Sequence, residues 1–120
     1  MAKRRGVTVD TARRLVMSFP GTDEGRCLGT DGFRVRGMIL ARFRDDDSVL
    51  VVKCGDTERD LRIRSDPLAF FITDDYRGHP SVLIRLDSVR EADLRDVLEV
   101  AWLRIASQRL RASYVLAKRR

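Results

Sequence analysis

The chain has 120 residues, of which 24 are Lys or Arg and 18 are Asp or Glu, and 43% of the residues are hydrophobic. This length suits one domain with a single core, and the apolar fraction argues against intrinsic disorder. The apolar runs fall far short of the roughly 18 residues that a membrane-spanning helix needs. We therefore expect a single mixed α and β domain over residues 1–120 that resides in the cytoplasm and has no membrane partner.

The net charge of +6 comes from the two ends of the chain. Residues 1–6 and 117–120, which we expect to be short basic tails, carry six cations and no carboxylate, so the body of the chain is neutral. Net charge therefore gives little reason to expect a polyanionic partner, unless the charges of the body are segregated onto different faces.

Helical spacing of apolar residues predicts an amphipathic helix over residues 8–19, with Thr8 or Asp10 as its cap. Residues 56–65 are ambiguous between helix and strand, and we favour a short helix there. The strongest helical pattern runs from about 90 to 106, and Ser88 with Glu91 is expected to form a capping box at its start. A second short helical piece is expected over residues 107–116.

Residues 26–54 carry the clearest β pattern, after a polar stretch at 22–25. Alternation predicts a hairpin whose three-residue connection is Arg36, Gly37 and Met38, with Gly37 in the left-handed conformation. This places Arg34, Arg42 and Arg44 on one face, opposite the apolar face. Further strands are expected at 49–52, as a central strand, and at 70–73 and 82–86.

Metal and nucleophile chemistry has little support in the sequence. The two cysteines, Cys27 and Cys54, form no CxxC motif, and His79 is the only histidine. Four zinc ligands cannot be assembled from these residues, and a catalytic cysteine would need a histidine partner. We expect two reduced, half-buried thiols, no metal, no cofactor and no enzymatic activity, with Trp102 placed in the core by its helical spacing.

Several segments together resemble the MmcQ/YjbR-like family. They are Phe19-Pro20-Gly21, Gly29-Thr30, Phe33 to Gly37, Leu40 to Phe43, Asp75 to Pro80 and the helix from Leu94 to Trp102. The resemblance implies an α+β fold, here with an antiparallel sheet of about five strands packed against N- and C-terminal helices. It also implies a "double wing" surface that binds DNA. Many members have an aromatic residue at or next to the position of Ser81, so a stacking role does not carry over there.

The expected nucleic-acid contacts are the arginines of the hairpin and the polar residues of the 75–80 loop. They are Arg34, Arg36, Arg42, Arg44, Tyr76, Arg77 and His79. Guanidinium groups can hold phosphate oxygens, and the loop combines rings with a guanidinium that could stack on a base. The alternative is a solvated sheet face and an ordinary turn whose tyrosine packs on the sheet.

The leading hypothesis is a small protein without enzymatic activity that binds the phosphate backbone of double-stranded DNA with weak sequence specificity. The second is a protein-interaction module that uses a sheet edge or the hairpin and exposes an apolar patch near Met38 and Leu40. An enzyme ranks third, and a ligand in a pocket lined by Asp75 and His79 would favour it.

Overall fold

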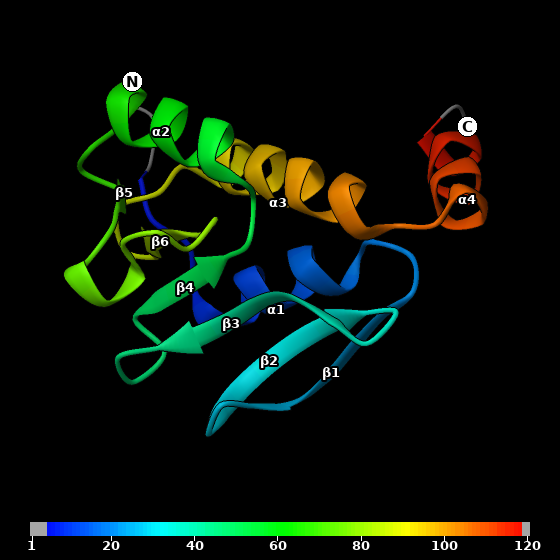
Figure 1. Cartoon of the computed structure of the whole chain (residues 1–120), viewed down its shortest axis with the longest axis horizontal. Helices are drawn as coiled ribbons and strands as arrows, with labels where there is room; N and C mark the ends of the chain where they lie inside the picture. Colours follow the sequence, from blue (N-terminus) through cyan, green and yellow to red (C-terminus); the bar gives the residue numbers. More distant parts are fainter. Residues whose placement is uncertain (1–4, 119–120) are drawn as a thin grey trace.

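A computed structural model describes residues 5–118 as a six-stranded antiparallel sheet with helices packed on one side (Figure 1). The strands follow the order β1-β2-β3-β4-β6-β5 across the sheet. The elements are α1 (Val9–Met17), β1 (Thr22–Cys27), β2 (Thr30–Val35), β3 (Met38–Arg44), β4 (Val49–Val52), α2 (Asp56–Ser65), β5 (Phe70–Phe71), the short 3₁₀ helix η1 (Asp74–Tyr76), β6 (Val82–Arg85), α3 (Glu91–Ile105) and α4 (Gln108–Lys118). The α+β class is confirmed, with one strand more than expected, because the polar stretch at 22–25 belongs to β1.

One face of the sheet is buried beneath the helices, and we call it the inner face. The cross-strand row of Ala41, Val52 and Val82 lies on it and belongs to the main apolar cluster. α1 adds Leu15 and Val16 to this cluster, and α3 adds five fully buried side chains. Partly buried side chains of α2 and α4 also pack against it, so all four α-helices of the described chain lie against the same core.

The predicted helices are confirmed in position, but the cap of α3 is not the expected one. Thr8 caps α1 by accepting a hydrogen bond from the Thr11 amide at 3.0 Å. At α3 the cap residue is Arg90, which makes no side-chain capping bond, and the Ser88 hydroxyl donates instead to Asp87. Ser88 lies two residues before the cap position, so it cannot form the capping box that the sequence suggested.

The β2–β3 hairpin corrects the predicted connection. Its turn has two residues, Arg36 and Gly37, both with positive φ (55° and 79°), as in the hairpin turns whose twist matches that of the strands. Val35 therefore pairs with Met38 inside the ladder. A bulge then leaves Leu40 unpaired between the two registers, and Leu40 is fully buried. Single-residue alternation could not predict this bulge.

An aromatic cluster joins α3 and α4 to the end of α1. The ring of Trp102, fully buried as predicted, lies 5.8 Å from Phe19 and 5.0 Å from Tyr114, and its indole nitrogen donates to the Pro20 carbonyl at 2.9 Å. The Tyr114 hydroxyl donates to Glu99, and Lys118 pairs with the same carboxylate at 3.1 Å. These contacts hold α4 at the end of α3 opposite to α2, as Figure 1 shows.

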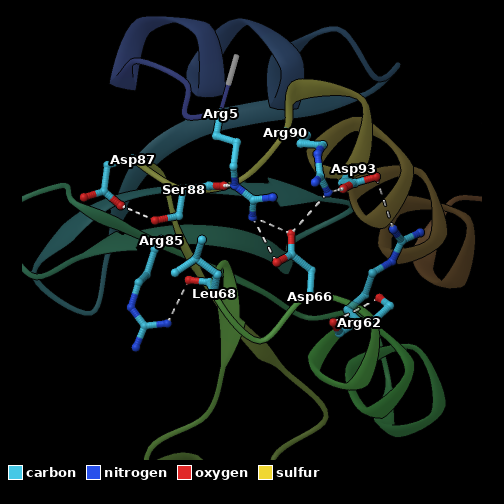
Figure 2. A network of polar contacts seen from close by, with 10 residues as sticks. Arg5, Arg62, Asp66, Leu68, Arg85, Asp87, Ser88, Arg90 and Asp93 are labelled. Carbon is cyan, nitrogen blue, oxygen red and sulfur yellow. Dashed lines mark hydrogen bonds and ion pairs between the residues drawn. The ribbon is translucent and has the colours of Figure 1, made fainter. Parts of the chain in front are cut away.

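A polar network centred on Asp66 connects the N-terminal segment, α2 and α3 (Figure 2). Arg5 donates to both carboxylate oxygens of Asp66, at 2.8 and 2.9 Å, and to the Ser88 carbonyl. Arg90 lies 3.7 Å from Asp66 and 3.7 Å from Asp93. Arg5 therefore does not belong to a free basic tail, and at the other end of the chain Ala117 and Lys118 belong to α4, whereas residues 1–4 and 119–120 of the expected tails lie outside the described residues.

We predict that Asp66→Asn lowers the free energy of unfolding by about 1–2 kcal/mol, because an amide cannot accept the charge-assisted pair from Arg5. Urea denaturation measures the change. Asp87→Asn is the matched control, since Asp87 is exposed and bonds only its neighbour Ser88, and it should stay within about 0.5 kcal/mol of wild type. Equal losses in both variants would contradict a special role for Asp66.

We also predict that Tyr114 titrates late. Burial, followed by its hydrogen bond to Glu99, raises the pKa of Tyr114 to about 12. The neutral phenol is therefore favoured by folding, so its contribution to stability is complete below pH 10 and is lost as the pH rises toward 12. In a Tyr76→Phe variant, absorbance at alkaline pH reports Tyr114 alone. The midpoint of the Tyr114 titration should lie near 12 in the folded protein and fall to about 10 in urea. A midpoint near 10 in the folded protein would contradict the docking of α4.

Candidate functional site: the outer face of the sheet

The opposite face of the sheet, which we call the outer face, carries the predicted arginines together with a small apolar cluster. Arg42 pairs with Val51, and Val51 pairs with Leu83, so these three side chains lie on this face. Val49, Val51 and Leu83 form the cluster, and the rings of Phe71 and Tyr76 pack against it. Partners in an antiparallel ladder share a face, and this places Arg34 beside Ile39 there as well. Simple alternation through Ala41 and Phe43 would put Ile39 on the apolar face, and the bulge at Leu40 places it on the outer face instead.

A hollow of about 330 Å³ opens on this face, between the β1–β2 turn and the loop at 74–80. Strands β3 and β4 supply residues to it, as do the β1–β2 turn, the loop at 74–80 and the residues Lys53 and Ser81 that follow β4 and the loop. Its lining consists of Leu28, Ile39, Arg42, Val51, Lys53, Asp75, Tyr76, His79 and Ser81. Four of the seven sequence-predicted contact residues lie in or beside this hollow, namely Arg42, Arg44, Tyr76 and His79.

Tyr76 organises the residues around the hollow. Its ring packs on the outer apolar cluster, and its hydroxyl accepts a hydrogen bond from Arg42. The guanidinium carbons of Arg42 and Arg44 lie 5.9 and 5.4 Å from the ring centroid, within the range of cation–π attraction. His79 meets the same ring edge-to-face at 5.6 Å. The tyrosine thus packs on the sheet, as one alternative held, and it also positions two arginines.

Carboxylates neutralise part of the predicted positive surface. Arg44 pairs with Asp45 at 3.3 Å and with Asp75 at 3.4 Å. The Thr73 hydroxyl and then Arg44 lower the pKa of Asp75, so this carboxylate stays charged. On the loop, Arg77 pairs with Asp74 at 2.8 Å. Neither Arg44 nor Arg77 is therefore a free phosphate ligand.

Two predicted residues lie away from the hollow. Arg34 is on the outer face, nearer the β1 edge, where it donates to the Arg26 carbonyl at 3.2 Å. Arg36, in the hairpin turn, donates to the Ile105 carbonyl at the end of α3, also at 3.2 Å. Arg36 therefore helps to hold the hairpin against α3, and the structure does not bring it to the same surface as Arg42.

Lys53 and Leu28 also line the hollow, although neither is among the contact residues expected from the sequence. Lys53 follows β4 and continues the outward alternation of Val49 and Val51, a signal that could have placed it on this face. Within residues 5–118, Lys53, Arg42 and Arg34 have no ion pair with a carboxylate. Leu28 stands at the tip of the β1–β2 hairpin, and no periodic pattern covers a turn.

The two thiols lie deeper than expected. Cys27 and Cys54 are free and fully buried rather than half-buried. Burial, with a smaller contribution from the charge of Glu58, raises the pKa of Cys54 to about 11, which suppresses the reactive thiolate. In the described part of the chain, no group of three His, Cys, Asp or Glu side chains is placed to hold a metal ion.

The base of the β1–β2 hairpin depends on a glycine. Gly32 pairs with Gly25 on β1 and with Arg42 on β3. A Cβ atom built on Gly32 would overlap the Cβ of Cys27, whereas a Cβ on Gly25 would meet nothing within 4 Å. The absence of a side chain at Gly32 therefore leaves room for the buried side chain of Cys27 and sets the path of the hairpin that carries Leu28.

We predict that Gly32→Ala lowers the free energy of unfolding by about 1–3 kcal/mol, because the added methyl group must displace Cys27. Gly25→Ala is the matched control in the same pair of residues, and it should be neutral or stabilising by up to about 1 kcal/mol. Thermal or urea denaturation measures both. A Gly32 variant as stable as the Gly25 variant would show that the two strands are not packed as described.

Comparison with protein families gives one finding. The family model described as YjbR matches residues 17–104, a segment that runs from the end of α1 to the end of α3 and includes the whole sheet. Comparisons with curated proteins and with solved structures return no match. Between residues 5 and 118, no helix has both the length and the apolar character to cross a membrane.

Proposed function

The chain belongs to the YjbR family, and from this premise we propose that its outer sheet face binds the phosphate backbone of DNA. The observation that carries the proposal is a group of three cations on neighbouring strands of the outer face, Arg34, Arg42 and Lys53, none of which pairs with a carboxylate among residues 5–118. They come from β2, β3 and the end of β4, which are neighbours in the sheet. Cations on adjacent strands can reach successive phosphates of one backbone.

The mechanism is electrostatic and depends little on sequence. Arginine offers a planar fork of donors to phosphate oxygens, and lysine acts as a point charge. All four described α-helices pack on the inner face, so none of them lies on the outer face to read the edges of bases in a groove. We therefore infer that binding has weak sequence specificity. Two projections flank the cations, the β1–β2 hairpin and the loop at 74–80, and we propose that they serve as the two wings that the family resemblance implies.

Two further observations weigh on the competing functions. Leu40 is fully buried and adds nothing to the apolar patch expected around Met38 and Leu40, whereas Met38 is 41% exposed and lines a hollow with Ile39 and Ile105, so the protein-interaction alternative keeps only the part of its patch around Met38. Asp75 and His79 do line one hollow, as an enzyme would need. However, the lowered pKa of Asp75 makes it a poor proton acceptor near neutral pH, and we propose a binding role without catalysis.

We predict that the protein binds fluorescently labelled duplex DNA saturably at about 50 mM salt, and that the logarithm of the affinity falls with the logarithm of the salt concentration with a slope of about −2.7 for three contacts. Arg42→Gln combined with Lys53→Gln should make this slope less steep by about 1.8, the contribution of two contacts. Fluorescence anisotropy at several salt concentrations measures it.

The matched control removes two exposed arginines from helices, Arg64→Gln with Arg109→Gln, and should leave the slope near its wild-type value. The absence of saturable binding at about 50 mM salt would remove the proposal. So would an equal change of slope in the control, because binding would then follow net charge rather than the outer face.

A further inference from the structure

We propose that the hollow on the outer face takes one unpaired base of a nucleic acid, with the adjoining phosphate on Arg42 and Lys53. This inference rests on the proposed function and gives it a preferred target, a strand with an unpaired nucleotide. The hollow joins apolar walls, two rings and two cations, which have no carboxylate partner within residues 5–118, in one space of about 330 Å³. That volume lies at the lower end of the roughly 300–1,000 Å³ of small-ligand sites.

The walls of the hollow suit the flat face of a base. Ile39 and Val51 supply apolar surface from the sheet, and Leu28 supplies it from the hairpin tip. Tyr76 and His79 add rings, and the tyrosine is fixed by its contacts with the outer apolar cluster and with Arg42. Bases stack on such rings in proteins that bind single strands, and a ring already held in place loses little freedom when it does so.

The charges of the hollow give the nucleotide an orientation. Arg42 and Lys53 lie on the strand side, whereas the carboxylate, Asp75, lies on the loop side. A phosphate is attracted to the first side and repelled from the second. An amino or imino group at the edge of a base can instead donate to Asp75, which remains charged beside Arg44.

Leu28 provides an independent observation. Its side chain is 76% exposed, and its backbone is left-handed with a φ of 54°. A branched apolar residue is unfavourable in that conformation, where Asn or Gly is preferred, and its exposure means that the folded chain gains little from it. Contact with a base would remove this apolar side chain from water.

An unpaired nucleotide within a strand fits better than a free nucleotide. Arg34 lies on the same face but does not line the hollow, so it is placed for a neighbouring phosphate that only a longer strand supplies. A base inside an intact duplex is stacked and paired and cannot enter the hollow without being extruded. A bulge, a loop or a strand end meets both conditions.

The test uses three DNA hairpins of the same stem: one fully paired, one with a single bulged adenine, and one with an abasic residue at the bulge. The abasic bulge retains the bend and the phosphate but lacks the base. We expect the adenine bulge to bind about tenfold more tightly than either of the others, in keeping with the stacking of one base on protein rings. Fluorescence anisotropy at a fixed salt concentration gives the three affinities.

The variant Leu28→Asn removes one wall and suits the left-handed backbone, so it should fold normally. It should bring the ratio between the adenine and abasic bulges close to one and leave the salt slope unchanged. Leu116→Asn is the matched control, an exposed leucine on α4 that should keep the wild-type ratio.

The outcomes separate the two proposals. If none of the hairpins binds, the proposed function fails and the base site fails with it. If all three bind equally, phosphate binding stands and the base site is overturned. Adenosine 5′-monophosphate is added as a competitor against the bulged hairpin. If the protein binds the free nucleotide more tightly than it binds the hairpin, the hollow is a site for a free nucleotide and the inference is overturned.

Discussion

The central constraint on this fold is that its helices pack on one face of the sheet. Trp102, Leu98 and their neighbours on α3 fill the inner face together with α1, so the apolar residues of the other face need a different cover. The loop at 74–80 supplies it by laying Tyr76 over Val51 and Leu83. The cover is partial, because a short loop cannot span six strands, and the uncovered part is the hollow. The candidate site is thus a consequence of helix packing on the opposite side.

Charge on the outer face is arranged by local pairing rather than by net excess. Arg44 and Arg77 are each matched by carboxylates of the nearby turn and loop, whereas Arg42 is held by a phenol hydroxyl that leaves its charge intact. The charges of Arg44 and Arg77 are largely cancelled by the nearby carboxylates, so an anion is attracted mainly to the positions where a cation lacks such a partner. The neutral body of the chain is therefore compatible with a small positive site on this face.

The elements that depend on periodicity could be predicted from the sequence. α3 and β4 were placed by their apolar spacing, and the face that carries Arg34, Arg42 and Arg44 followed from alternation. The bulge at Leu40 could not be predicted, because an extra residue is decided by the twist of the hairpin and by the space beneath it. The pairing of Arg44 with Asp75 depends on a contact between residues 31 positions apart, and no local pattern carries that information.

The pairing of β4 with β6 joins segments that are far apart along the chain, with α2, β5 and the 74–80 loop between them. Both walls and the floor of the hollow come together only when this non-local pairing has formed, so the unfolded ensemble contains no binding site. Any molecule that occupies the hollow must then favour the native state by mass action and raise the melting temperature. Calorimetry could therefore screen for ligands of this protein without an assay for its biological activity.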